Sequence, residues 1–446
     1  MRASGSLSRG PKHPTNTDQT RVASNFQPER NPNHKEIRWD AANSNKHLDS
    51  SLSCECKGMN NRLRIGFVSL GDPRDRKVWS GTPYHLLEAL EQCNVTVEVL
   101  GPLKRHFRYP LMPFKIAARL AKRDVEFDRY PIALRSYARQ LKEQIRQRPV
   151  DVILSASSVP IAMLECSQPI VFYTDALYNM MPEYYRGQWD RYTIAAQNRG
   201  KRQEQAALDR SSIAVYASHW AADEARKLTQ PSKVRIVPFG ASMAVEHDHA
   251  NLQNWIEERL SRASAECRLL FIGVDWLRKG GDVAVETARL LNWMGIKTKL
   301  TVVGCRPEKK FQDFVEFRGF LNKQTAEGRD ELRRLYQEAN FFLLPTSAEA
   351  AGIVFCEACA HGLPILTFRT GGVPDYVRNG INGMCLPSDS KPEDFARNIA
   401  EILKDSDRYT ALCHAGYSDY RNRLNWDTAA SALIDLCHEA VQNRRT

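Results

Sequence analysis

Two glutamates eight residues apart, Glu349 and Glu357, stand in the most informative stretch of this chain. The apolar run 341–344 precedes them and ends at Pro345, which predicts a buried strand that stops at a loop. Gly352 then opens a short helical pattern, which ends in a Gly-then-Pro sequence. One carboxylate is therefore expected on a strand-to-helix loop and the other one to two turns into the helix.

The start of that helix has the chemistry of a diphosphate site. First-turn backbone N–H groups of a helix are unpaired donors, and the helix dipole favours an anion beside them. We expect a diphosphate to lie on the amides of Gly352, Ile353 and Val354, while Glu357 holds a pair of hydroxyls such as a ribose offers. Glu349 then points at the group that the phosphate carries.

This acidic pair, in its strand–loop–helix context, resembles the signature of retaining glycosyltransferase family 4. Two glutamates at this spacing are common alone, but the Gly352–Val354 insert, the preceding 345–347 and the following Ala358 all agree with the signature. The resemblance implies nucleotide-sugar donors and the GT-B fold. It covers about residues 62–446 and is most specific over 269–377.

The resemblance also assigns a basic residue to the leaving diphosphate. Lys279 lies between a predicted strand and helix and supplies a point charge, and Arg278 beside it can add a forked donor. The family commonly has a basic residue directly after the glycine that matches Gly273, but this chain has Val274 there. Whether Arg278 replaces that residue stays open, because a neighbour of Lys279 can point away from the ligand.

Further contacts are predicted where other strands end. Arg318, Gly319 and Phe320 lie where related enzymes contact the nucleotide base, often through backbone groups. In the first half, Gly81 matches a glycine loop that faces the donor phosphate, unless this loop is an ordinary helix N-cap. Asp175 either orients an acceptor hydroxyl or caps the helix that follows.

Strand patterns alternate with helical patterns through most of the chain, which favours parallel, doubly wound sheets. We expect an α/β protein of the GT-B class, with two Rossmann-like domains facing a central cleft. Few hydrophobic residues cluster in 1–61, so we expect a disordered N-terminal extension. The predicted parts that follow are an acceptor-side domain at 62–241, a linker at 242–263, a nucleotide-sugar-binding domain at 264–424, and a helix at 425–446 that the resemblance implies crosses back to the first domain.

The composition narrows the partners. A formal net charge of +11 favours anionic partners such as nucleotide diphosphates or anionic lipids. No zinc-finger spacing, RNP-type motif or helix-turn-helix pattern accompanies it, so nucleic acid is not expected. No apolar run approaches the roughly 20 residues of a membrane span, and the N-terminus lacks a signal-peptide core, so we expect a cytoplasmic protein, at most peripheral on the inner face of the membrane.

The eleven cysteines are scattered, which suits reduced thiols rather than a disulfide framework. Cys356 and Cys359 form a C-x-x-C, but no second paired cluster exists to complete a metal site. Because residues at i and i+3 share a helix face, core packing is the favoured role for this pair.

One segment, 104–123, holds seven lysines and arginines and no acidic residue. Lys115, Arg119 and Lys122 share one helical face, and apolar residues such as Phe114 form another. This segment either lies on an anionic membrane or is a solvated helix whose apolar stripe packs on the core.

The resemblance implies a retaining hexosyltransferase of polysaccharide biosynthesis. It would move a hexose from a UDP-, GDP- or ADP-linked donor to a hydroxyl of a sugar, polysaccharide, lipid-linked or small-molecule acceptor. Lys279 and the helix start at Gly352 stabilise the departing diphosphate, and Glu349 and Asp175 complete the expected catalytic set. No Asp-x-Asp stands in a matching loop, so neither a metal nor a cofactor besides the nucleotide sugar is expected.

Two alternatives remain from other classes of protein. A nucleotide-sugar 2-epimerase also uses paired α/β halves, but the acidic pair with its helix glycine argues against it. A catalytically silent nucleotide-sugar-binding protein is disfavoured by intact Lys279, Glu349 and Glu357.

Overall fold

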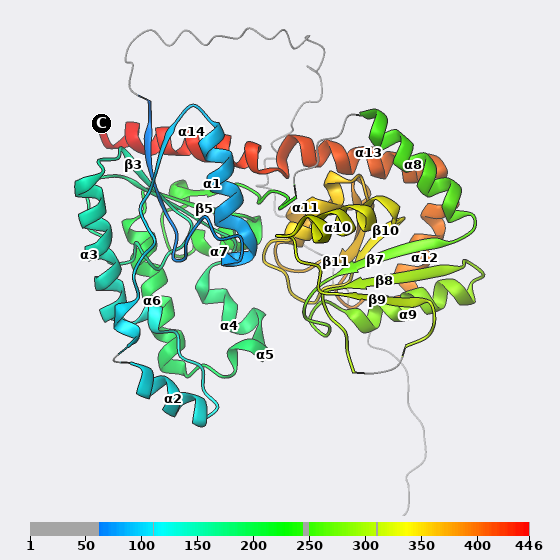
Figure 1. Ribbon diagram of the computed structural model, residues 1–446, viewed down its shortest axis with the longest axis horizontal. Helices are drawn as coiled ribbons and strands as arrows, with labels where there is room; N and C mark the ends of the chain where they lie inside the picture. Colours follow the sequence, from blue (N-terminus) through cyan, green and yellow to red (C-terminus); the bar gives the residue numbers. More distant parts are fainter. Residues whose placement is uncertain (1–61, 110, 244–248, 309–310, 446) are drawn as a thin grey trace, which may run out of the picture. The chain divides into compact units, whose positions relative to one another are not determined.

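The computed structural model describes residues 62–109, 111–243, 249–308 and 311–445. The predicted disordered extension, 1–61, lies outside the described residues. Within them, two six-stranded parallel sheets with flanking helices form the two halves of the molecule (Figure 1).

The first sheet has the strand order β2-β1-β3-β4-β5-β6. Most of its strands are short apolar runs buried on both faces, which is what a parallel sheet covered by helices on each side requires. The strands are β1 (Arg64–Val68), β2 (Thr96–Val99), β3 (Val152–Ser155), β4 (Ile170–Thr174), β5 (Ile213–Tyr216) and β6 (Val234–Ile236).

The second sheet has the order β12-β11-β10-β7-β8-β9, which numbered within this half is the Rossmann order read from its far edge. Its central strands consist almost entirely of Leu, Ile, Val and Phe. The strands are β7 (Cys267–Ile272), β8 (Thr298–Val303), β9 (Val315–Gly319), β10 (Phe341–Leu344), β11 (Ile365–Phe368) and β12 (Gly383–Leu386).

Helices connect most of the successive strands and cover both faces of each sheet (Figure 1). The first half contains α1 (Thr82–Gln92), α2 (Met112–Leu120), α3 (Pro131–Gln147), α4 (Met181–Tyr184), α5 (Arg186–Trp189), α6 (Ile194–Arg210) and α7 (His219–Arg226). The remaining helices are α8 (His249–Ala263), α9 (Gly281–Trp293), α10 (Ala326–Glu338), α11 (Ile353–Ala360), α12 (Pro392–Leu403), α13 (Ser406–Arg423) and α14 (Trp426–Arg445).

The last helix crosses back to the first half. α14, drawn in red in Figure 1, contacts α1, β3 and β4. Its buried face carries Ala430, Leu433, Cys437 and Ala440, so the apolar stripe of this helix closes the core of the first half. This is the crossover that the family resemblance implies.

The segment 242–263, expected as a linker, contains a helix that belongs to the second half. α8 packs on α10, α13 and β7. Its Arg259 is fully buried and donates to the carbonyls of Tyr336 and Gln337 at the end of α10, and of His361 and Gly362 just after α11, at 2.9–3.0 Å. A guanidinium therefore caps the carboxyl ends of two helices, where unpaired carbonyls and the dipole attract a cation.

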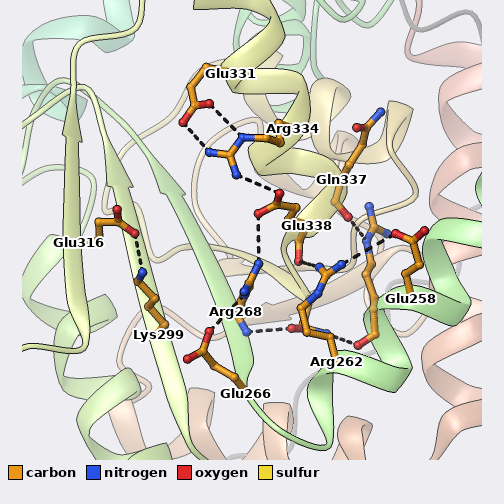
Figure 2. Close-up of polar contacts among 12 residues, drawn as sticks. Glu258, Arg262, Glu266, Arg268, Lys299, Glu316, Glu331, Arg334, Gln337 and Glu338 are labelled. Atoms are coloured by element: carbon orange, nitrogen blue, oxygen red, sulfur yellow. Dashed lines mark hydrogen bonds and ion pairs between the residues drawn. The ribbon is translucent and has the colours of Figure 1, made fainter.

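An ion-pair network continues from this point along the amino end of the second sheet (Figure 2). Arg268 of β7 pairs with Glu266 and Glu338, at 3.2 and 3.1 Å. Glu338 also accepts from Arg334, which binds Glu331 at 2.7 Å. Every charge in this chain of pairs is compensated, so the network ties α10 to β7 at the edge opposite the carboxyl ends of the strands.

Cys356 and Cys359 are both fully buried, in agreement with their predicted packing role. In the part of the chain that the structure describes, all nine cysteines are free thiols. Over the same residues, no helix combines the length and the apolar composition that a membrane crossing requires.

Candidate active site

The second sheet has a switch point between β7 and β10. The chain continues from β7 toward β8 on one side and from β10 toward β11 on the other, so the loops after these two strands diverge. Such a crevice at the carboxyl ends of parallel strands is where ligands bind in open α/β sheets. The two loops are 273–280 and 345–352, which carry the basic and acidic residues predicted from the sequence.

Both basic residues of the first loop converge on Glu349. The Lys279 ammonium forms an ion pair with Glu349 Oε2, and both side chains are largely buried. Arg278 Nη1 lies 3.8 Å from the same carboxylate oxygen and donates to Ala348 O at 2.8 Å. Arg278 therefore does not point away from Glu349, and it lies on the same side of the crevice as Lys279.

The loop geometry lets Lys279 reach this position. Its aliphatic stem passes over Gly273, where a Cβ would lie 2.9 Å from Lys279 Cγ. A larger residue at the end of β7 would push the ammonium out of the crevice. The glycine at this strand end is thus required by the close approach of the lysine.

Glu357 lies in the second turn of α11 and is fully buried. Its Oε2 accepts from the Tyr336 hydroxyl at 2.9 Å, and its Oε1 is paired with the Lys323 ammonium. A buried carboxylate is tolerated here because both oxygens have partners. A ribose can take the Oε1 position only if Lys323, which is about one-third exposed, moves aside.

The predicted helix start is confirmed at Gly352, which is the N-cap of α11. Phe355 N–H donates to Gly352 O at 2.8 Å, so the hydrogen bonding of the helix begins there. Ile353 and Val354 occupy the first-turn positions whose amides have no carbonyl partner within a helix.

A cavity of about 440 Å³ opens where β7, β8 and β9 end, and Lys323, the partner of Glu357, lies in its wall. The first half contributes Gly81 and His85 to its wall, and the second half contributes Gly273, Phe320 and Lys323. Gly81 has a φ of +82° and begins α1 without a side-chain cap, so the alternative of an ordinary side-chain N-cap does not apply. The volume lies within the range of about 300–1,000 Å³ that small-ligand sites occupy.

The side chain of Arg318 lies outside the cavity, although the predicted base contact is one that related enzymes often make through backbone groups. Its guanidinium binds Glu316 at 2.7 Å and lies 3.9 Å from Glu331, within the surface network rather than in the cavity. Side chains at i and i+2 of a strand share a face, so Arg318 follows Glu316 away from the ligand. Gly319 O accepts from Gly304 N–H at 2.8 Å, and Phe320, which is exposed, remains as the predicted contact in the cavity wall.

Asp175 lies just beyond β4 of the first half, close enough to Glu349 for the two carboxylates to repel each other. Burial, followed by repulsion from Glu349, raises the pKa of Asp175 to about 6. The next helical turn, 178–180, starts at Leu177 without a side-chain cap, so Asp175 does not have the capping role that was its alternative. It lines a second cavity on its own side of the cleft.

Two tyrosines that sequence reasoning missed bridge the halves. Glu349 N–H donates to the Tyr184 hydroxyl at 2.9 Å, and Ala350 N–H donates to the Tyr185 hydroxyl at 3.0 Å. They come from the end of α4, a four-residue helix too short to leave a periodic pattern in the sequence. They fix the backbone of the acidic loop from across the cleft.

The Tyr184 hydroxyl also packs against the loop after β11, where only glycine leaves room for it. The Tyr184 hydroxyl also bonds Thr370 Oγ1 at 2.8 Å, which brings it against the loop after β11. Gly371 has a φ of +50°, and a Cβ there would lie 2.1 Å from the Tyr184 oxygen. Any other residue would separate the two halves at this point.

Among the residues that the structure describes, no three His, Cys, Asp or Glu side chains gather as a metal-binding group. The cleft is instead built from a Lys–Glu pair, an arginine, a buried glutamate and a helix start.

Solved structures share this architecture. Sucrose-phosphate synthase from Thermosynechococcus elongatus has a TM-score of 0.58 at 16% identity, over 86% of this chain and 100% of that one. Anabaena HepE in complex with UDP-glucose has a TM-score of 0.55 at 12% identity, over 85% of this chain and 100% of that one. Two Rossmann-like halves with the crossover helix α14 define the GT-B fold.

Residues 256–419 match the family model described as glycosyl transferases group 1. The resemblance drawn from the Glu349–Glu357 signature is thereby confirmed. D-inositol 3-phosphate glycosyltransferase from Salinispora tropica is 28% identical over 236 residues, and the chain spans about half the length of that relative. Lipopolysaccharide glucosyltransferase WaaG from Escherichia coli is 25% identical over 281 residues, 60% of this chain and 72% of WaaG.

Proposed function

We propose that the chain is a retaining glycosyltransferase that moves a hexose from a nucleotide-diphosphate sugar to a hydroxyl, without a metal ion. The observation that carries this proposal is the convergence of Lys279 and Arg278 on Glu349, beside a helix start and the buried Glu357. Cations at this position suit a departing diphosphate, and a carboxylate suits the hydroxyls of the sugar attached to it. The glycosyl transfer for which the relatives are named, and the UDP-glucose bound to HepE, support the same class of reaction.

In this reaction the nucleotide occupies the cavity beside Phe320, and Glu357 releases Lys323 to receive the ribose hydroxyls. The diphosphate lies on the first-turn amides of α11, near Lys279. The bond between the anomeric carbon and the phosphate oxygen breaks as charge builds on the diphosphate. The acceptor oxygen forms the new bond from the same face, and its proton passes to the leaving phosphate, so the configuration is retained without a protein nucleophile.

The donor and the acceptor are proposed by class. HepE was solved with UDP-glucose, so UDP-sugars are the first donors to test, followed by GDP- and ADP-sugars. Two relatives are named for an inositol phosphate and for lipopolysaccharide. The acceptor is accordingly proposed as a sugar, a growing polysaccharide or a lipid-linked sugar.

Incubation with a panel of nucleotide sugars tests the function. Transfer predicts that free nucleoside diphosphate accumulates and that a suitable acceptor accelerates its release. An isomerised sugar without nucleotide release would identify an epimerase instead. A rise in melting temperature with nucleotides but no turnover would identify a silent binding protein, because ligands that bind only the folded state stabilise it.

The Glu357→Gln variant is expected to bind nucleoside diphosphate tenfold or more weakly. Glutamine keeps an acceptor for Tyr336 but loses the charge-assisted bonds to ribose, worth about 1.5–3 kcal/mol each. Calorimetric titration measures the affinity. The matched control is Glu331→Gln, which removes a carboxylate of α10 that is paired with Arg334 outside the cavity. Equal affinities for both variants and the wild type would refute the ribose assignment.

We further propose peripheral contact with anionic membranes through 104–123. No residue of α2 is buried, and Met112, Ile116 and Leu120, spaced at i, i+4 and i+8, are 46%, 57% and 81% exposed. This observation disfavours the alternative in which the apolar stripe packs on the core. Lys115 and Arg119 flank these side chains within the helix.

Of the three basic residues predicted to share one helical face, only Lys115 and Arg119 lie within α2. Lys122 lies beyond the end of α2 with a φ of +53°, so it leaves the helical face that Lys115 and Arg119 share. A basic helix with exposed apolar side chains suits the interface of an anionic bilayer, where each cation contributes about 1 kcal/mol.

Vesicle flotation at low salt, where screening is weakest, measures this contact. Wild-type protein is expected to float with anionic but not with neutral vesicles, and Lys115→Glu with Arg119→Glu should abolish flotation. The control reverses two exposed arginines at the same spacing on α3, Arg135→Glu with Arg139→Glu, and should still float. Absence of wild-type flotation would exclude the membrane contact.

A further inference from the structure

A second cavity, of about 460 Å³, lies at the carboxyl edge of the first sheet. Its wall is formed by the loops that follow β1, β3 and β4, at residues 69–71, 156–158 and 174–176. β1 lies between β2 and β3, so this edge is also a switch point, the place where open sheets bind ligands. The molecule therefore has a ligand-sized cavity at the carboxyl edge of each sheet.

The two cavities are separate but adjacent. The 3-10 turn Val78–Gly81 contributes Val78 and Trp79 to the second cavity, and Ser80 and Gly81 to the nucleotide cavity. Asp175 belongs to the second cavity, and repulsion between Asp175 and Glu349 contributes to its raised pKa. A ligand in the second cavity thus lies on the side of the cleft that faces the Lys279–Glu349 pair.

Aromatic side chains form part of the wall. Trp79, Tyr178 and Trp189 all line the cavity. Tyr178 and Trp189 pack edge to face with centroids 5.0 Å apart, which holds both rings in fixed orientations. Rigid aromatic rings suit the C–H faces of sugar rings, which are apolar although the ring edges carry hydroxyls.

Three carboxylates in the wall, Glu126, Asp175 and Glu204, face two guanidiniums, Arg105 and Arg129. Arg129 is already engaged: its Nε binds Glu126 at 3.1 Å and its guanidinium stacks on Tyr178 at 4.0 Å. Its Nη1 donates to Gln203 Oε1. It is therefore held by neutral and acidic partners rather than presented to an incoming anion.

The other charged groups are also committed. Arg105 lies 3.5 Å from Asp128 and donates to Leu70 O at 3.3 Å. Glu204 is buried and accepts from Ser158 Oγ at 2.5 Å. Burial raises the pKa of Glu204, but even with Glu204 neutral the lining carries no net positive charge at neutral pH. A phosphate would meet carboxylates without a free cation in this wall, whereas hydroxyls would find acceptors.

The geometry points to an acceptor subsite for an uncharged sugar, with one hydroxyl directed to Asp175 and another toward the donor. This inference rests on the proposed glycosyltransferase function and names the substrate class of its acceptor side. Asp175 accepts a hydrogen bond from a neighbouring hydroxyl of the sugar and so positions the ring, while the attacking hydroxyl gives its own proton to the departing phosphate. The aromatic side chains pack against the apolar face of the sugar ring. The carboxylates accept hydrogen bonds from free hydroxyls and repel a phosphorylated sugar.

Saturation-transfer NMR titrations test this, with methyl hexosides and the corresponding hexose 6-phosphates as probes, with and without UDP. Wild-type protein is expected to bind the uncharged sugars at least about tenfold more tightly than the phosphates. Glu126→Gln removes one carboxylate and frees Arg129, so it should reduce this preference by about threefold or more. Glu143→Gln is the matched control, since Glu143 forms an exposed pair with Arg146 outside the cavity, at 2.6 Å, and should leave the preference unchanged.

Three results would overturn the assignment: equal or tighter wild-type binding of the phosphates, no binding of any uncharged hexoside, or the same preference in both variants. Donor turnover separates this inference from the proposed function. Turnover of a nucleotide sugar without hexoside binding would refute the subsite alone. Selective hexoside binding without any donor turnover would refute the proposed function and leave the sugar site standing.

Discussion

Replacing Lys279 with methionine is expected to lower turnover by about 10²–10³-fold while nucleotide affinity falls much less. The ammonium lies in the crevice after β7, paired with Glu349, where charge develops on the leaving diphosphate. A preorganised donor to such a charge is worth about two to three orders of magnitude in turnover, because it acts on the transition state more than on the ground state. Methionine keeps an unbranched stem to pack over Gly273, so the loop should retain its conformation.

The control for this prediction is Arg278→Met in the neighbouring position. Arg278 also approaches Glu349, but at 3.8 Å, and it is tied to Ala348 O, so its loss should cost less turnover. Steady-state kinetics with a fixed donor measure kcat and KM for both variants. If Lys279→Met stays within about twofold of the wild type while Arg278→Met is inactive, the two residues have exchanged the roles assigned to them.

The fold was predictable because its signals are local. Apolar runs such as 341–344, alternating with helical patterns, indicated the parallel sheets of both halves. The signal of β12 is weaker, because Gly383–Leu386 contains no β-branched residue and follows a turn rather than a helix-length pattern. Within 242–263, the polar residues around α8 conceal how deeply Arg259 is buried.

The signature residues of the candidate site could also be predicted, because each is marked by its near neighbours in the sequence. Lys279, Glu349, Gly352 and Glu357 each follow a strand end, and parallel strands bring such ends to one edge. The face of a strand is harder to predict: the pattern fixes that Arg318 and Glu316 share a face but not which one. A register shift between β8 and β9 near Val303 adds to this uncertainty, because a shift of one residue exchanges the faces.

The partners of the site could not be predicted, because they come from distant parts of the chain. Tyr184 and Tyr185 bond amides 165 residues away, across the cleft. Lys323 reaches Glu357 from the loop between β9 and α10, and Tyr336 reaches it from α10. No sequence pattern marks either residue as a partner of Glu357. Such contacts depend on how the halves and loops pack, which local periodicity does not encode.

The Arg259→Met variant is expected to be the most destabilised of those considered, by about 3–5 kcal/mol in the free energy of unfolding. The guanidinium has no exposed surface and four donor contacts to carbonyls at the ends of α10 and α11. Methionine fills part of the volume but leaves those carbonyls buried without donors, and each such loss is costly. Urea unfolding followed by circular dichroism measures the change.

Arg262→Met is the matched control, since Arg262 lies one turn away on α8, is partly exposed and caps only Glu338 O, at 2.9 Å. Its loss should cost about 1 kcal/mol or less. Because α10 carries Tyr336 and α11 carries Glu357, loosening both helix ends should also raise the dissociation constant for nucleoside diphosphate in folded Arg259→Met protein. Equal stabilities of the two variants would mean that water replaces the guanidinium at these carbonyls. Arg259 would then be a filler of the core, and the donor-site helices would be held by their apolar faces alone.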